Sequence, residues 1–207
     1  MIGGMIMELK IKDPGSALTH FIAMLAAMAA AAPLLVKAAS VPGTMHLKAL
    51  SVFIVSMILL YAASTVYHTF DISEHVNKLL RKIDHMMIFI LIAGTYTPVC
   101  LIVLGNRSGY RMLSLVWGIA IVGIIINALW INCPKWFSSV IYIAMGWVCV
   151  MAIRQIVAAL TPAAFAWLLA GGIIYTIVGV MYALKLPMFN ANNKNFYFQE
   201  LFLLRLM

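Results

Sequence analysis

The chain has 207 residues, of which 65% are hydrophobic and only 10% are charged, and its formal net charge is +8. A water-soluble domain needs more polar surface than this composition can supply, so the composition excludes a soluble globule and indicates an integral membrane protein. Because the basic residues lie between apolar stretches and no basic patch with interleaved aromatic residues occurs, we expect no nucleic-acid binding.

Six apolar stretches have about the 20 residues that an α-helix needs to cross a bilayer. Backbone polar groups in lipid must be satisfied within the protein, and continuous stretches of this length favour helices over a barrel. We therefore predict an all-α, polytopic transmembrane helix bundle. The expected spans cover about residues 17–36, 47–67, 83–104, 112–131, 136–153 and 162–184.

One connection and one interruption stand out along the chain. The segment 68–82 is polar and is predicted to be the loop between the second and third spans. Gly94 and Pro98 interrupt the third span, where glycine permits close helix packing and proline permits a kink.

The distribution of lysine and arginine predicts the orientation, because basic residues prefer the cytoplasmic side. With a cytoplasmic N-terminus, eight basic residues lie inside and five outside. The inner set is Lys10, Lys12, Lys78, Arg81, Lys82, Lys135, Lys185 and Lys194, and the outer set is Lys37, Lys48, Arg107, Arg111 and Arg154.

Ser64, His68 and Asp84 are the candidate functional residues. Ser64 and His68 are four residues apart and share a helical face. His68 ends the second span and Asp84 begins the third at the same membrane face, so the connecting loop can bring them together. Ionisable groups at membrane depth are costly and point by default to a functional site, and imidazole and carboxylate both suit zinc. This spacing permits a metal site but does not establish one.

Simpler interpretations of these residues remain open. His68 could be an interfacial histidine or one hydrogen-bonded to a neighbour. Asp84 could be a first-turn acid favoured by the helix dipole. His85 could serve in packing or at the interface, and His20 could line the bundle or lie at the interface.

Five segments together resemble the haemolysin III family, the bacterial branch of the progestin and adipoQ (adiponectin) receptor superfamily. They are Ala17–His20, Ser64–His68, Ile83–His85, Ala93–Pro98 and Gly171–Thr176. The resemblance implies a seven-helix bundle in the bacterial cell membrane, with a cytoplasmic N-terminus and a zinc site near the cytoplasmic face. It implies His68 as a zinc ligand, Asp84 as a ligand or a residue acting through a water, and Ser64 nearby.

The C-terminus departs from the family pattern. The resemblance implies two histidines on the seventh helix as the remaining zinc ligands, but Gln199 and Leu203 stand at those positions. We interpret residues 195–207 as the remnant of a truncated or altered seventh helix, produced by a frameshift or premature stop. The chain is then a single domain over 1–207 with a cytoplasmic N-terminus at 1–16. Since two imidazoles are missing, we expect weak or no zinc binding by this chain alone.

The resemblance implies a zinc-dependent hydrolase of lipid-like amides or esters, or a lipid sensor in membrane homeostasis. Asp84 would orient a water or act as a base, and Ser64 would donate a hydrogen bond nearby. The alternatives are a pore-forming haemolysin and a non-catalytic membrane protein. The expected partners are membrane lipids and a lipid-like substrate or ligand, and the sequence does not indicate an oligomeric state.

Overall fold

A computed structural model describes residues 11–130 and 135–184, and this part of the chain is helical without a strand. Six helical stretches are long and apolar enough to cross a membrane, which confirms the predicted polytopic bundle. The predicted seventh helix lies outside the described residues. The elements are α1 (Pro14–Ala39), α2 (Met45–Thr69), α3 (Glu74–Pro98), η1 (Val99–Leu104), α4 (Arg107–Leu129), α5 (Lys135–Gly146), η2 (Trp147–Ala152), α6 (Ile153–Ala159) and α7 (Pro162–Leu184).

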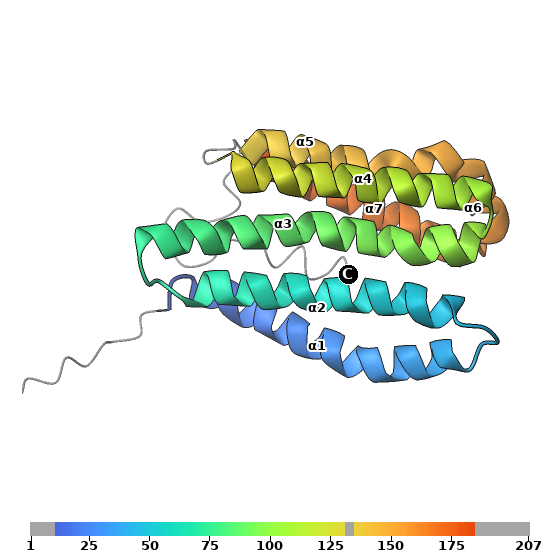
Figure 1. Ribbon diagram of the computed structural model, residues 1–207, viewed down its shortest axis with the longest axis horizontal. Helices are drawn as coiled ribbons and strands as arrows, with labels where there is room; N and C mark the ends of the chain where they lie inside the picture. The colour runs from blue at the N-terminus through green and yellow to red at the C-terminus, as the bar shows by residue number, and fades with distance from the viewer. Residues whose placement is uncertain (1–10, 131–134, 185–207) are drawn as a thin grey trace, which may run out of the picture.

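Helix α3 is central to the bundle (Figure 1). It packs against α2 on one side and α4 on the other, while α1 packs on α2 and α7 packs on α5. One apolar core, which includes Phe89, Val116 and Met145, lies between α3, α4 and α5. A second core, which includes Ile54 and Leu91, lies between α1, α2 and α3. Because α3 contributes to both cores, its side chains are positioned from two sides.

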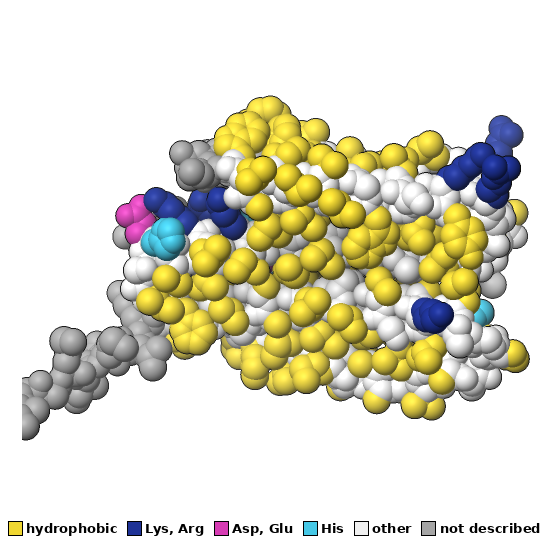
Figure 2. Space-filling view, in the orientation of Figure 1, with side chains coloured by type: hydrophobic (Ala, Val, Ile, Leu, Met, Phe, Trp, Pro, Cys, Tyr) yellow, Lys and Arg dark blue, Asp and Glu magenta, His cyan; other side chains and the backbone are white. Residues whose placement is uncertain are grey.

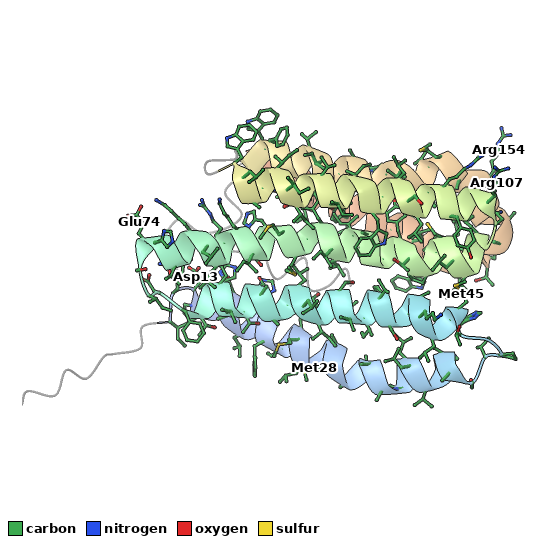
Figure 3. All side chains as sticks on the ribbon, in the orientation of Figure 1. Asp13, Met28, Met45, Glu74, Arg107 and Arg154 are labelled. Atoms are coloured by element: carbon green, nitrogen blue, oxygen red, sulfur yellow. The ribbon has the colours of Figure 1, made fainter. Side chains whose placement is uncertain are left out.

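The outside of the bundle matches a bilayer. Hydrophobic side chains cover the visible flank between two charged ends (Figure 2). One end carries Asp13 and Glu74, and the opposite end carries Arg107 and Arg154 (Figure 3). An apolar band between charged ends is the surface that a hydrocarbon core with two polar interfaces requires. The chain is therefore a multi-pass membrane protein.

The connection between the second and third spans is shorter than predicted. Most of segment 68–82 is helical, because α3 begins at Glu74. The Ser73 hydroxyl accepts a hydrogen bond from the Val76 N–H at 3.3 Å, which caps the helix. An ion pair between Glu74 and Lys78, one turn apart and 2.6 Å in length, further stabilises the first turns of α3. The loop prediction was wrong because polar residues continue α3 beyond the apolar span.

The structure shows close helix packing at Gly94 and a change of helical geometry at Pro98, as predicted for the third span. Gly94 lies against Ser56 of α2, and a Cβ atom there would overlap the Ser56 side chain. Pro98 ends the regular α-helix, and the π-helical segment η1 follows directly. Proline lacks the N–H that would bond one turn back, so the helical geometry changes at this residue.

Replacing Gly94 with alanine should destabilise the protein by about 1–3 kcal/mol, since the added methyl group overpacks the α2–α3 contact. Unfolding by sodium dodecyl sulfate, followed by circular dichroism, measures the change. Gly118→Ala on α4 is the matched control, because no atom lies within 4 Å of its added Cβ. Equal stability of the two variants would contradict the close approach at Gly94.

The fifth span is interrupted, because the 3₁₀ segment η2 separates α5 from α6. Tyr96 of α3 reaches this junction. Its hydroxyl donates to the Gly146 carbonyl at 2.7 Å and accepts from the Cys149 N–H at 2.9 Å. Irregular backbone at membrane depth needs partners inside the protein, and the Tyr96 hydroxyl supplies them here.

Tyr96→Phe should lower the free energy of unfolding by about 1–3 kcal/mol, since the part-buried Cys149 N–H and Gly146 C=O each lose a hydrogen bond. The same detergent unfolding experiment measures this loss. Tyr110→Phe on α4 is the control, because Tyr110 is half exposed. If the two variants unfold alike, Tyr96 does not support the interruption of the fifth span.

Candidate metal centre

Buried polar side chains gather at the end of the bundle where α1 and α3 begin and α2 ends. Among the described residues, only Ser56 and Thr97 of the buried polar set lie away from this end. Tyr142 and Lys82 connect it to α4 and α5, because the Tyr142 hydroxyl donates to the His85 carbonyl at 2.9 Å and Lys82 donates to the Ala128 carbonyl at 3.1 Å. The buried polar residues at this end are Ser16, His20, Ser64, His68, Asp84, Asn127, Ser138 and Ser139.

His68 lies in the last turn of α2 and is buried, with 8% of its surface exposed. Its Nδ1 atom is 3.0 Å from the Asp13 Oδ2 atom. The structure therefore favours the buried, hydrogen-bonded placement over the interfacial one. Asp13 comes from the start of α1, on the same end of the bundle (Figure 3).

Aromatic rings enclose the His68 imidazole. The His20 ring stacks on it at 5.6 Å between centroids and 13° between planes. Tyr67 presents its ring at 4.6 Å and 61°. His20 also lies 6.0 Å from the Tyr61 ring, and only 5% of His20 is exposed. Of the two placements left open for His20, the structure shows the one that lines the bundle.

Asp84 is buried within α3, at 8% exposure. It lies about three turns after Glu74, so its interpretation as a first-turn acid is wrong. The helix begins earlier than the apolar span, which moves Asp84 away from the N-terminal dipole. The His85 Nδ1 atom is 3.5 Å from the Asp84 Oδ2 atom, so His85 contacts the carboxylate.

Ser64 is buried one turn before His68, as predicted from the spacing of four residues. The structure therefore brings Ser64, His68 and Asp84 to the same end of two adjacent helices. His68 contacts Asp13, His20 and Tyr67, and Asp84 contacts His85.

Lys12 lies beside this cluster, just before α1. Its Nζ atom is 3.6 Å from the centre of the Tyr67 ring, a cation–π contact. Burial lowers the pKa of Lys12, and the nearby carboxylates of Asp13, Asp71 and Asp84 oppose that shift. The charges of Asp13 and Asp84 thus both act at the Lys12 ammonium.

Comparison with known proteins identifies the family. Residues 9–201 match the family described as Haemolysin-III related. The chain is 34% identical over 174 residues to the "Hemolysin-3 homolog" of Bacillus subtilis (strain 168), covering 84% of this chain and 81% of that protein. It is 36% identical over 177 residues to the "Hemolysin-3" of Bacillus cereus, covering 85% and 80%. The chain belongs to the haemolysin III family.

The donor chemistry of this haemolysin III chain fits zinc in part. His68 and Asp84 offer an imidazole nitrogen and a carboxylate, which zinc accepts in proteins. Within residues 11–130 and 135–184, no group of three or more His, Cys, Asp or Glu side chains could hold a metal ion. Gln199 and Leu203 lie outside the described residues. The two groups of His68 and Asp84 are fewer than the three or four protein ligands that a zinc site normally has, so the described residues alone do not complete one.

Asp13 is the site residue that the sequence interpretation missed. Its signal was weak, because an aspartate before a proline at the start of a helix usually indicates only an N-cap. The contact partner His68 is 55 residues away. Spacing along one helix cannot reveal such a contact, whereas it did reveal the shared face of Ser64 and His68.

Proposed function

We propose that this haemolysin III chain carries a membrane-embedded polar site that binds zinc weakly and hydrolyses a lipid-like amide or ester. The observation that carries the proposal is the buried His68 imidazole held by the Asp13 carboxylate at 3.0 Å. Histidines that ligate metals usually donate their other ring N–H to a carboxylate or carbonyl in this way. The family relationship and the neighbouring Asp84 support the same assignment.

Each residue of the site has a chemical role in the proposal. Zinc, when bound, would polarise a carbonyl and make a water more acidic. His68 would hold the metal through a ring nitrogen. Asp84, a buried carboxylate that His85 contacts, would act as the general base and accept a proton from the attacking water. Ser64, one turn before His68, would donate a hydrogen bond to the substrate.

The surroundings of the site favour a lipid-like substrate. The site lies at one end of an apolar bundle whose flank would face acyl chains (Figure 2). A molecule with an apolar tail and a carbonyl near its polar head would reach this depth with its tail still in the bilayer. Membrane lipids are therefore the proposed partners. The lipid-sensing alternative uses the same binding site without turnover.

We further propose that this end of the bundle is cytoplasmic and that the chain resides in the bacterial cell membrane. Lys78, Arg81 and Lys82 belong to the exposed or half-exposed N-terminal part of α3 at this end. Such a cluster next to a span favours retention on the cytoplasmic side.

The purified full-length protein in lipid nanodiscs should bind zinc weakly and should hydrolyse ceramides or lipid esters only when zinc is supplied. Zinc binding is measured by competition with a chromophoric chelator, and turnover by mass spectrometry with and without that chelator. His68→Ala should abolish specific zinc binding. Asp84→Ala should lower turnover by about 10²–10⁴-fold, as expected for loss of a general base.

His75→Ala provides the matched control, because His75 is an exposed imidazole in the first turn of α3 at the same end. It should leave both zinc binding and turnover unchanged. Equal zinc binding by the wild type and His68→Ala, or turnover that is unaffected by the chelator, would contradict the zinc-hydrolase proposal. Dye release from liposomes by the wild type, without turnover, would favour the pore-forming alternative.

A further inference from the structure

The end of the bundle opposite the polar site carries only basic charge among the described residues. The acids of residues 11–130 and 135–184 lie before α1, between α2 and α3, or in the first half of α3, and they are Asp13, Asp71, Glu74 and Asp84. Figure 2 shows the same separation on its visible face. A surface of one charge sign favours an anionic partner. The basic residues of this end are Lys37, Lys48, Arg107, Arg111 and Arg154.

Three exposed arginines, Arg107, Arg111 and Arg154, form a basic cluster at one corner of this end. Arg107 and Arg111 are four residues apart in α4 and therefore share a helical face. Arg154 belongs to α6. The Asn106 Nδ2 atom donates to the Gln155 Oε1 atom at 3.3 Å, which joins the chain neighbours of Arg107 and Arg154. Figure 3 accordingly shows these two arginines at the same corner.

The basic cluster is not balanced by acids of the described chain. The ion pairs found within the described residues all use acids of the other end. Arg107 and Arg111 repel each other, because like charges four residues apart in a helix are destabilising. The first N–H groups of α4 are already capped, since the Asn106 side chain accepts from Ser108 and Gly109. The guanidinium groups are thus the donors that this corner offers, and guanidinium binds phosphate through paired N–H···O bonds.

An apolar stripe continues from the cluster along α4. Leu115, Gly118 and Val122 follow Arg111 by four, seven and eleven residues, so they share its helical face, and all of them are exposed. A Cβ atom on Gly118 would meet no atom within 4 Å, which leaves the stripe open at that level. On the neighbouring element η2, Met151 is 77% exposed. A molecule with an anionic head and apolar chains could contact the cluster and the stripe together.

We propose that Arg107, Arg111 and Arg154 bind the phosphate of an anionic glycerophospholipid whose acyl chain lies along the apolar stripe of α4. A lipid fits better than a soluble anion, because the cluster borders the apolar band that faces the bilayer (Figure 2). The site uses neither the metal nor the substrate of the proposed function and lies at the opposite end of the bundle. Failure of either proposal therefore leaves the other unaffected.

Lipid binding can be measured by native mass spectrometry of the full-length protein in detergent. The wild type should bind phosphatidylglycerol about 10–100-fold more tightly than phosphatidylcholine with the same acyl chains, since each basic side chain near the headgroup contributes about fivefold. Arg107→Gln combined with Arg154→Gln should remove most of this preference and leave phosphatidylcholine binding unchanged. Equal affinity of the wild type for the two lipids, or an unchanged preference in the double variant, would overturn the proposal.

Lys37→Gln combined with Lys48→Gln is the matched control. It removes the same charge from the same end, but from α1 and α2 instead of α4 and α6. Its affinity for phosphatidylglycerol should stay within about twofold of the wild type. A loss as large as that of the arginine double variant would show attraction to the whole charged end and would overturn the assignment to the cluster.

Arg111→Lys tests the role of the guanidinium group. It keeps the charge but loses the paired hydrogen bonds, so it should lose part of the preference for phosphatidylglycerol. Circular dichroism checks that each variant keeps its helices. If the arginine double variant does not fold, Arg107→Lys combined with Arg154→Lys replaces it, and an affinity equal to that of the wild type would overturn the proposal.

Inorganic phosphate distinguishes a lipid from a soluble anion. Phosphate lacks an acyl chain and gains nothing from the apolar stripe, so it should not displace phosphatidylglycerol when both are present at equal concentration. Displacement under that condition would assign the arginine cluster to a soluble anion and would overturn the lipid proposal.

Discussion

Hydrogen-bond satisfaction of the backbone within lipid is the constraint on which this structure depends. Regular α-helix meets it through its own repeating bonds, but the fifth span is interrupted by the 3₁₀ segment η2. The Tyr96 hydroxyl compensates at Gly146 and Cys149. A side chain of the central helix thus completes the backbone of a neighbouring span, which couples α3 to α5 beyond apolar packing.

The same constraint explains why the polar site lies at one end. Burying His68 and Asp84 costs free energy unless each finds a polar partner. Near the end of the bundle, the segment before α1 can provide such a partner, and Asp13 does so for His68. At mid-depth, the available partners would have to come from the apolar spans themselves. The site is therefore located where the fold can satisfy buried polar groups at the least cost.

The six spans and the family could be predicted from the sequence, because apolar length and ordered motifs are local signals. The shared face of Ser64 and His68 followed from helical spacing for the same reason. The start of α3 could not be located from hydropathy, since Glu74 to Lys82 is polar and nevertheless helical. That error also misplaced Asp84 relative to the helix start. The Asp13–His68 contact depends on how α1 meets α2, which no local pattern records.

The separation of Asp13 and His68 in sequence also has a consequence for biosynthesis. These residues are 55 positions apart and belong to the first two spans. A chain made from its N-terminus inserts α1 well before the end of α2 emerges from the ribosome. Asp13 therefore has no His68 to contact until the end of α2 has been synthesised. The contact thus joins the two arms of the first helical hairpin only after both have been made.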